Sequence, residues 1–254
     1  MAKRIRVEFE GPRTAIVTGG AKRIGAELVR ALAADGWHVL IHYHHSLAEA
    51  EALSREVGNA AIVAADLADP SSAETILDAA ADLPPPHLLV NNAALFAPDD
   101  IADFTPESWA AHLDVNLRAP ALLSRAFAAR AGRGLIVNML DAKLASLNPD
   151  FFSYTISKIG LGGLTELCAR AFAPAIRVCG IAPSVTMVSG PQSRANFDKV
   201  RSMNALGRGV DVSEIVAALR FIVATPTMTG HTILLDGGQR FLSLPRDVQF
   251  LEPQ

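Results

Sequence analysis

Residues 14–25 read Thr14-Ala15-Ile16-Val17-Thr18-Gly19-Gly20-Ala21-Lys22-Arg23-Ile24-Gly25, an apolar, β-branched run that leads directly into a glycine-containing turn. The run predicts a buried strand over Thr14–Thr18, and the pattern after the turn predicts a helix over Ile24–Ala34. Glycines in such a turn let the backbone approach a pyrophosphate, and the amides of the helix N-terminus favour its negative charge. The stretch therefore predicts a dinucleotide-binding fold. The contacts that we expect from it are Gly19, Arg23, Ile24 and Gly25.

The rest of the chain repeats this alternation of short apolar runs and Ala-rich helical patterns. Such alternation is typical of βαβ units, whose right-handed crossovers build a doubly wound parallel sheet. We predict an α/β fold with a single Rossmann-type domain over residues 1–254, in which helices flank a parallel sheet of about seven strands. The further predicted strands are His38–Tyr43, Ala61–Ala65, Leu88–Asn91, Gly134–Asn138, Arg177–Ile181 and His231–Asp236. The further predicted helices are Leu47–Val57, Ser71–Asp82, Pro106–Arg130 with a possible bend at Pro120, one that carries Tyr154 and Lys158 and ends near Phe172, and Val212–Ala224.

Composition narrows the class of protein. Of the 254 residues, 50% are hydrophobic and 19% are charged, which is enough for a core on both faces of a sheet. A net charge of −3 without a dense Lys/Arg run argues against nucleic-acid and membrane partners. Cys168 and Cys179 lack metal-ligand spacing and predict buried thiols in the cytoplasm. Residues 1–11 form a predicted N-terminal extension without the apolar run of a signal peptide.

The second predicted strand ends in His42-Tyr43-His44-His45-Ser46, where NAD enzymes carry an acidic residue for the adenosine ribose. A carboxylate there would repel a 2′-phosphate, whereas Arg23, the histidines and the Ser46 hydroxyl can donate to one. We therefore predict NADPH rather than NADH. A metal site is disfavoured, because strand alternation separates the histidines and no carboxylate or cysteine completes a ligand set. The contacts predicted here are His42, Tyr43, His44 and Ser46.

Two further strand ends would meet the nucleotide. Asp66 and Leu67 follow the third strand, where the Asp66 side chain and a backbone amide could hold an adenine; a turn or helix-capping aspartate is an equal alternative. Asn92 and Ala93 follow the fourth strand and place small residues where a nucleotide passes close to the backbone. We therefore predict cofactor contacts at the carboxyl ends of the third and fourth strands.

Tyr154 and Lys158 stand one helical turn apart, so both side chains reach the same small volume. An ammonium beside a phenol favours the phenolate, and such a pair can exchange a proton near neutral pH. The spacing alone occurs on many helices with a buried tyrosine and a solvated lysine. The cofactor motifs around it indicate a proton-transfer pair.

Taken together, these motifs resemble the short-chain dehydrogenase/reductase family over nearly the whole chain. The matching residues are the Thr18–Gly25 turn, Asp66, Asn91-Asn92-Ala93, Asn116, Tyr154 and Lys158. Within the family the chain is most similar to pteridine reductases and bacterial dihydromonapterin/dihydrofolate reductases. The features that carry this narrower resemblance are Arg23 in place of the middle glycine of the turn, His42-Tyr43-His44 with Ser46, Asp141 where most members have serine, and Phe96, which pteridine reductases stack on the pterin.

The resemblance implies roles for individual residues. Lys158 would bind the nicotinamide ribose and lower the Tyr154 pKa, Asn116 would hold a water of a proton relay, and Thr186 would contact the carboxamide. Departures are His45, where near relatives often carry arginine, and Pro183-Ser184 in place of Pro-Gly. The resemblance also implies a homotetramer that pairs through Ala-rich helices.

Two segments remain outside these motifs. Residues 184–208 are long enough for a substrate lid. Residues 239–254 form a C-terminal tail that either closes a neighbour's pocket in an assembly or is a flexible terminus.

Asp141 bears on the direction of the reaction. An ionised carboxylate near Tyr154 would raise the phenol pKa and keep the phenol protonated. Tyr154 is then better placed to act as an acid, giving a proton, than to act as a base. A hydride would then pass from NADPH to a C=N or C=O carbon while Tyr154 gives the proton, and a carboxylate would stabilise positive charge on a pterin nitrogen. A purely structural capping role for Asp141 is the alternative. The predicted catalytic residues are Asp141, Tyr154, Lys158 and Asn116, and the predicted substrate contacts are Phe96, Asp141 and Tyr154.

The leading prediction is an NADPH-dependent reductase of a dihydropterin or folate-like heterocycle. A ketone reductase of another substrate is the alternative within the enzymes. A non-catalytic NADP-binding sensor is a further alternative, which intact Tyr154, Lys158 and Asn116 disfavour.

Overall fold

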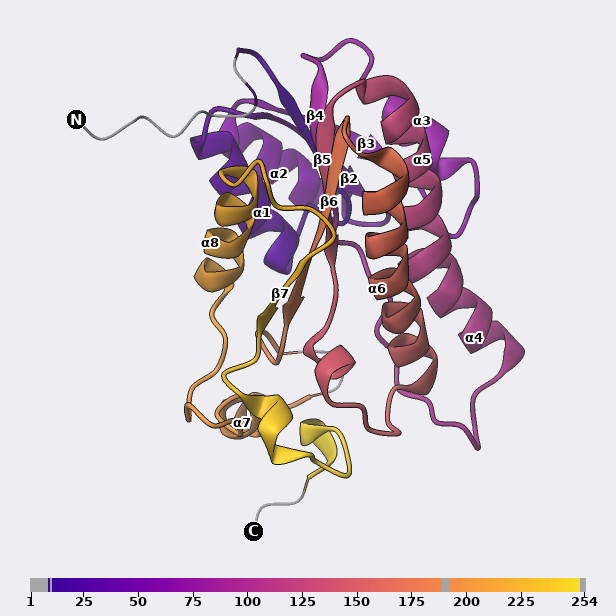
Figure 1. Cartoon of the computed structure of the whole chain (residues 1–254), viewed down its shortest axis with the longest axis vertical. Helices are drawn as coiled ribbons and strands as arrows, with labels where there is room; N and C mark the ends of the chain where they lie inside the picture. Colours follow the sequence, from indigo (N-terminus) through magenta and orange to yellow (C-terminus); the bar gives the residue numbers. More distant parts are fainter. Residues whose placement is uncertain (1–8, 10, 189–191, 252–254) are drawn as a thin grey trace, which may run out of the picture.

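A computed structural model describes residues 9, 11–188 and 192–251 (Figure 1). Its sheet has seven parallel strands in the order β3-β2-β1-β4-β5-β6-β7, which confirms the predicted doubly wound fold. Continuous apolar runs form the central strands because both faces of the sheet are covered. The strands are β1 (Thr14–Val17), β2 (His38–Tyr43), β3 (Ala60–Ala64), β4 (Pro86–Asn91), β5 (Gly134–Met139), β6 (Ile176–Pro183) and β7 (Thr232–Leu235).

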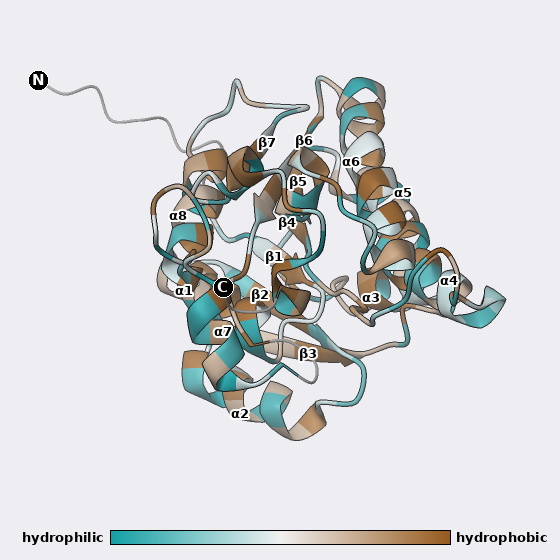
Figure 2. Cartoon of the chain, turned by 90° about the horizontal axis from the view of Figure 1, so that it is seen from below, coloured by the Kyte–Doolittle hydropathy of each residue, from teal (hydrophilic) through white to brown (hydrophobic). Residues whose placement is uncertain are grey.

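Helices cover the two faces of the sheet as separate layers, each with its own core (Figure 2). Leu28 and Ile222 represent the first core, and Phe127 and Leu123 the second; all four side chains are fully buried or nearly so. The first layer consists of α1 (Arg23–Ala34), α2 (Leu47–Val57) and α8 (Val212–Val223). The second layer consists of α3 (Ser72–Asp78), α5 (Ala119–Ala131) and α6 (Phe152–Phe172).

The parallel register brings the carboxyl ends of the strands to one edge. Asn91 of β4 pairs with Asn138 of β5, and Met139 of β5 pairs with Ile181 of β6. The strand order reverses between β1 and β4, and ligands of open α/β sheets bind outside the carboxyl ends at such a switch point. The edge therefore gathers the segments that follow β1, β4, β5 and β6.

The helix predicted over Pro106–Arg130 is wrong in detail. The structure divides it into α4 (Pro106–Leu113), a π-helical turn η1 (Asp114–Arg118) and α5. Pro120 is the second residue of α5, close after the π turn. The wider π turn carries Asn116, whose side chain is completely buried. The predicted helix over Ser71–Asp82 is also too long, since α3 ends at Asp78.

The two segments outside the motifs contain structure that periodicity did not reveal. Helix α7 (Arg194–Val200) lies within the predicted lid 184–208, of which residues 189–191 fall outside the described part. Short 3-10 helices, η3 (Gln239–Leu242) and η4 (Val248–Phe250), fold the tail back beyond the carboxyl edge beside α7 (Figure 1). The predicted extension 1–11 lies outside the described residues except for Phe9 and Gly11. Among the described helices, none combines the length and apolarity needed to cross a bilayer.

Candidate active site

Hydrogen bonds to the segment that follows β4 hold the turn after β1 in place. Asn92 donates its amide to the carbonyls of Thr18 and Gly19 at 2.9 and 3.2 Å. The Thr18 hydroxyl accepts from the backbone amides of Asn92 and Ala93 at 2.9 and 3.0 Å. At Gly25 an added Cβ would overlap the Gly19 carbonyl oxygen and lie 2.8 Å from Asn92 Nδ2. Gly25 therefore allows the start of α1 to lie close to the Gly19 carbonyl, and a larger residue at this position would prevent that contact.

His42 supports this turn and does not project from it. Its side chain is 2% exposed, Nδ1 accepts from the Gly19 amide at 3.1 Å, and Nε2 lies 3.1 Å from the Ala65 carbonyl. Burial lowers the pKa of His42, so the ring is neutral and donates from Nε2 to that carbonyl. The predicted contact of His42 with the 2′-phosphate is corrected, because both ring nitrogens are already engaged.

The other cofactor contacts predicted at the end of β2 are Tyr43, His44 and Ser46, which are less buried than His42. The rings of His44 and His45 stack with centroids 3.5 Å apart, and His44 Nε2 lies 3.9 Å from Asp66 Oδ2. Asp66 Oδ1 accepts from the Ala68 amide at 2.9 Å, which is the turn aspartate that the sequence left as an equal alternative. Tyr43, Ser46 and Leu67 lie in the same region but do not line the main cavity, which is the one that contains Arg23, Asp141 and Tyr154.

Arg23 adopts a backbone conformation that L-residues avoid. Its φ of 56° lies in the left-handed region, where the Cβ of a non-glycine residue crowds its own backbone. Arg23 also lines the main cavity at the start of α1. The side chain is therefore retained at a position whose backbone favours glycine, and such strain is found preferentially at functional sites.

Tyr154 and Asp141 form a buried hydrogen-bonded pair. The Tyr154 hydroxyl donates to Asp141 Oδ2 at 2.8 Å, and Asp141 Oδ1 accepts from the Lys143 amide at 2.8 Å. Asp141 thereby caps the 3-10 helix η2 (Ala142–Ala145). The same carboxylate therefore caps a helix and accepts a hydrogen bond from Tyr154. Lys158 donates to the Met139 carbonyl at 2.6 Å, and its Nζ lies 5.6 Å from the centroid of the Tyr154 ring.

Burial dominates the protonation of this group. Burial raises the pKa of Asp141, and burial together with the Asp141 charge raises the pKa of Tyr154 well above its ordinary value. Burial lowers the pKa of Lys158 to about 8. The Asp141 charge raises the Tyr154 pKa as expected, and the net direction is opposite to the lowering that the resemblance implies for Lys158. A tyrosine whose pKa is raised keeps its proton until a substrate accepts it, which suits a proton donor.

Asn116 uses its side chain inside the protein. Its Oδ1 accepts from the Leu95 amide at 2.8 Å, and its Nδ2 donates to the Leu95 carbonyl at 2.9 Å and to Ser157 Oγ at 3.0 Å. These bonds tie the strand-end segment that carries Phe96 to helix α6. The implied role of Asn116 in a proton relay stays a prediction, and its side-chain amide is engaged with protein partners.

Phe96 belongs to an aromatic column. Its ring stacks on Phe151 at 4.2 Å between centroids and meets Tyr154 edge-on at 4.7 Å, and Phe151 in turn stacks on Phe250 at 5.5 Å. Phe96 lines the main cavity. Stacking on Phe151 occupies one face of the Phe96 ring.

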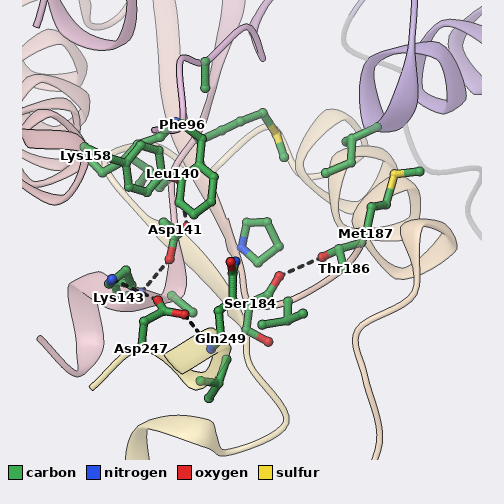
Figure 3. Close-up of a pocket in the computed structure, with 18 of the residues that line it drawn as sticks. Phe96, Leu140, Asp141, Lys143, Lys158, Ser184, Thr186, Met187, Asp247 and Gln249 are labelled. Atoms are coloured by element: carbon green, nitrogen blue, oxygen red, sulfur yellow. Dashed lines mark hydrogen bonds and ion pairs between the residues drawn. The ribbon is translucent and has the colours of Figure 1, made fainter. Parts of the chain in front are cut away.

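The main cavity has a volume of about 430 Å³, and its lining runs from the cofactor turn past Tyr154 to the C-terminal segment. That volume is within the range of small-molecule sites. Figure 3 shows Phe96, Asp141, Lys158 and Asp247 among the side chains that line it. The predicted residues that line it are Gly19, Arg23, Ile24, Gly25, Asn92, Ala93, Phe96, Asp141, Tyr154, Lys158, Pro183 and Thr186. Further lining residues, none of which the sequence analysis assigned to this chain's own pocket, include Lys143, Ser146 and Asn148, together with Gln239, Arg240, Leu244, Arg246, Asp247, Val248 and Gln249 of the predicted tail. Lys143 stands two residues after Asp141 and was open to prediction, whereas the residues from 239 onward carry no local signal.

Residues 19–240 match a family model described as Enoyl-(Acyl carrier protein) reductase. The chain belongs to the short-chain dehydrogenase/reductase family. Members of the family are oxidoreductases, so the fold, the turn after β1 and the Tyr154–Lys158 pair have a common explanation.

Solved structures of this family include two close likenesses. FolM alternative dihydrofolate reductase 1 from Brucella canis, complexed with NADP, is 36% identical with a TM-score of 0.86; the match covers 91% of this chain and 94% of that one. FolM alternative dihydrofolate reductase 1 from Brucella suis, also in complex with NADP, is 37% identical with a TM-score of 0.86 over 91% and 95% of the two chains. The predicted NADP cofactor and the narrower resemblance agree with these neighbours.

Curated relatives carry other activities in their names. L-xylulose reductase from Bos taurus is 32% identical over 89% of this chain and 96% of its own length. Granaticin polyketide synthase putative ketoacyl reductase 2 from Streptomyces violaceoruber is 31% identical over 90% and 96% of the two chains. The family thus includes proteins named as carbonyl reductases as well as the dihydrofolate reductases above, so membership alone does not determine the substrate.

Proposed function

We propose that the chain is an NADPH-dependent reductase of a C=N bond in a dihydropterin or related folate-like heterocycle, with Tyr154 as the proton donor. The observation that carries this proposal is the buried hydrogen bond from Tyr154 to Asp141 inside the cavity that follows the cofactor turn. Most of the family has a serine in place of Asp141, and a serine hydroxyl suits a substrate carbonyl. A carboxylate suits a nitrogen that gains positive charge.

The residues at the strand ends fit a nicotinamide dinucleotide. Gly25 lets α1 begin directly against the Gly19 carbonyl, where an added Cβ would overlap the oxygen, and the amides of this turn and helix start favour a pyrophosphate. Arg23, His44, His45 and Ser46 supply donors for a 2′-phosphate, and Lys158 and Thr186 lie in the cavity beyond. When bound, NADPH supplies a hydride.

The proton comes from the chain itself. Because burial and Asp141 keep the Tyr154 phenol protonated, its hydroxyl donates to the ring nitrogen beside the carbon that is reduced. Positive charge on that nitrogen is stabilised by the Asp141 carboxylate, whose pKa falls again next to a cation. Phe96 lines the same cavity, where a flat heterocycle would contact it.

Reduction of a ketone is the second candidate, which the names of the xylulose and ketoacyl reductases favour. Under it Tyr154 would protonate an alkoxide oxygen, and Asp141 would act as a cap of η2 alone. The sensor reading needs no proton donor and leaves the buried pair unexplained.

NADPH consumption separates these functions in one assay with dihydrobiopterin, dihydrofolate, L-xylulose and a panel of ketones. We expect turnover with the dihydropterin or dihydrofolate and little with the ketones. Turnover confined to ketones would replace the proposed substrate class. NADPH binding without turnover of any compound would favour the sensor.

Arg23→Gly tests the proposed 2′-phosphate contact. Relief of the left-handed strain should raise the free energy of unfolding by about 1 kcal/mol, while loss of a charged donor should weaken NADPH binding roughly 10-fold. Denaturant unfolding and NADPH fluorescence titration measure the two effects, and NADH affinity should change less. Arg23→Lys is the matched control, because it keeps both the charge and the strain. Unchanged NADPH affinity in Arg23→Gly would remove Arg23 from the cofactor site.

The proposal extends to a cytoplasmic homotetramer. Cys168 and Cys179 are both free and buried, as thiols in a reducing compartment are. Ile159 and Leu167 expose apolar surface on α6, with 40% and 66% of each residue accessible. Sizing in solution tests the assembly.

A further inference from the structure

Lys143 links two parts of the cavity that are distant in sequence. Its backbone amide donates to Asp141 Oδ1 at 2.8 Å, while its Nζ donates to Asp247 Oδ2 at 3.0 Å and to the Asp150 carbonyl at 2.9 Å. Figure 3 shows the contacts of Lys143 with Asp141 and with Asp247. The side chains of Lys143 and Asp247 are 10% and 13% exposed, so solvent screens this ion pair less than a surface pair. One residue thus holds both the Asp141 carboxylate and the C-terminal segment.

A second ion pair anchors the same segment. Asp150 is buried, and its carboxylate accepts from Arg246 Nε at 2.9 Å and from the Asp247 amide at 2.6 Å. Although burial opposes ionisation, these donors hold the pKa of Asp150 below its usual range. A buried carboxylate with this many donors is costly to release, which favours a docked C-terminal segment.

Aromatic contacts also connect the C-terminal segment to the Tyr154 ring. The column Phe250–Phe151–Phe96 ends on the Tyr154 ring, and Lys143 Nζ lies 5.0 Å from the centroid of Phe151. Phe151 has a φ of 55°, an unfavourable conformation for a non-glycine residue that its surroundings have to maintain. The contacts on both sides of Phe151 therefore depend on Phe250 as well as on Phe96.

We propose that residues 244–250 complete the substrate pocket of their own chain, and that Lys143 is the positioning residue that joins this segment to the Asp141–Tyr154 pair. Leu244, Asp247 and Gln249 line the same cavity as Asp141 and Tyr154. After burial and Asp141, the Asp247 charge also raises the Tyr154 pKa. The inference goes beyond the proposed function, since it holds for a pterin or a ketone alike.

The test compares Lys143→Met and Asp247→Asn with the parent, and uses dihydrobiopterin as substrate, or L-xylulose if the pterin is not reduced. We expect kcat to fall and the substrate KM to rise, with a combined loss in kcat/KM on the order of 10–100-fold, because a small displacement of the catalytic pair is costly. NADPH affinity by fluorescence titration should stay within about twofold, since the cofactor turn is untouched. Lys143→Arg, which retains the ion pair, should recover part of kcat.

Asp35→Asn is the matched control. It removes a carboxylate that receives Arg220 Nε and Nη2 at 2.7 and 2.9 Å, between the end of α1 and α8 and outside the cavity. We expect kcat and KM to remain as in the parent. The double variant Lys143→Met with Asp247→Asn should lose no more than the worse single variant, because both changes break one contact.

Limited trypsin digestion gives a readout that needs no substrate. Cleavage after Arg246 should be faster in Lys143→Met than in the parent and in Asp35→Asn, while Asp247→Asn is assessed by kinetics alone because residue 247 adjoins the cleaved bond. If Lys143→Met does not fold, Asp247→Asn and Lys143→Arg carry the kinetic comparison. The inference is overturned if cleavage after Arg246 and kcat/KM both match the parent, or if activity falls only in step with NADPH affinity.

Discussion

Tyr154→Phe is expected to lower kcat by roughly 10²- to 10⁴-fold, the usual contribution of a positioned proton donor. The substitution removes the hydroxyl that donates to Asp141 and leaves the ring that meets Phe96 edge-on. NADPH affinity should be nearly unchanged, because the turn after β1 is held by Asn92 and Thr18. Steady-state kinetics together with a fluorescence titration of NADPH measure both quantities.

Two control measurements show whether a loss of activity in Tyr154→Phe comes from misfolding or from a damaged cofactor site. The thermal unfolding midpoint shows whether Tyr154→Phe is folded, and retained NADPH binding shows whether its cofactor site is intact. A kcat within about threefold of the parent would remove Tyr154 from the proton-transfer step and would leave the general-acid account without its donor.

Asp141→Asn is expected to lower kcat/KM for a dihydropterin by about 10²-fold or more, as loss of an electrostatic stabiliser does. The amide keeps the size of the side chain but cannot carry the negative charge that stabilises a protonated nitrogen. Stability should not fall with activity. Burial raises the pKa of Asp141, so the folded state binds a proton more readily than the unfolded state, and the contribution of this group to stability decreases as pH rises past the unfolded pKa.

A spectroscopic readout separates the electrostatic role from capping. The Asp141 charge raises the Tyr154 pKa, so Asp141→Asn should let the Tyr154 phenol ionise at a lower pH than in the parent. Absorbance of the phenolate follows this shift, with Tyr154→Phe as the blank. An unshifted titration together with a kcat/KM close to that of the parent would assign Asp141 to the cap of η2 alone, because an asparagine caps a helix about as well as an aspartate.

Sequence reasoning reached the sheet because each strand carries its own local signal. β2, with His38–Tyr43, agrees with the prediction to the residue, and the other strands differ by a few residues at their ends. The cofactor turn was predictable for the same reason, since strand, glycines and helix follow one another in 14–25. The π turn was not, because a π segment within a helical pattern leaves the apolar periodicity almost unchanged.

The substrate end of the cavity depends on contacts between distant residues. Lys143 and Asp247 are 104 positions apart, and neither residue stands in a motif. His42 and Asn116 were recognised as family residues, but their hydrogen-bond partners, Gly19 and Leu95, become visible only in the fold. Burial likewise decided the direction of the Tyr154 pKa, which spacing to Lys158 alone predicted in the opposite sense.

The central claim is that Asp141 directs this reductase toward a nitrogen heterocycle. The most direct measurement is the ratio of kcat/KM for dihydrobiopterin to kcat/KM for a ketone, with NADPH, in the parent and in Asp141→Ser. The account predicts a ratio that favours the dihydropterin in the parent and falls by about 10²-fold in Asp141→Ser, where a serine hydroxyl suits a carbonyl. A ratio that stays the same in the two proteins, or that favours the ketone in the parent, would contradict it.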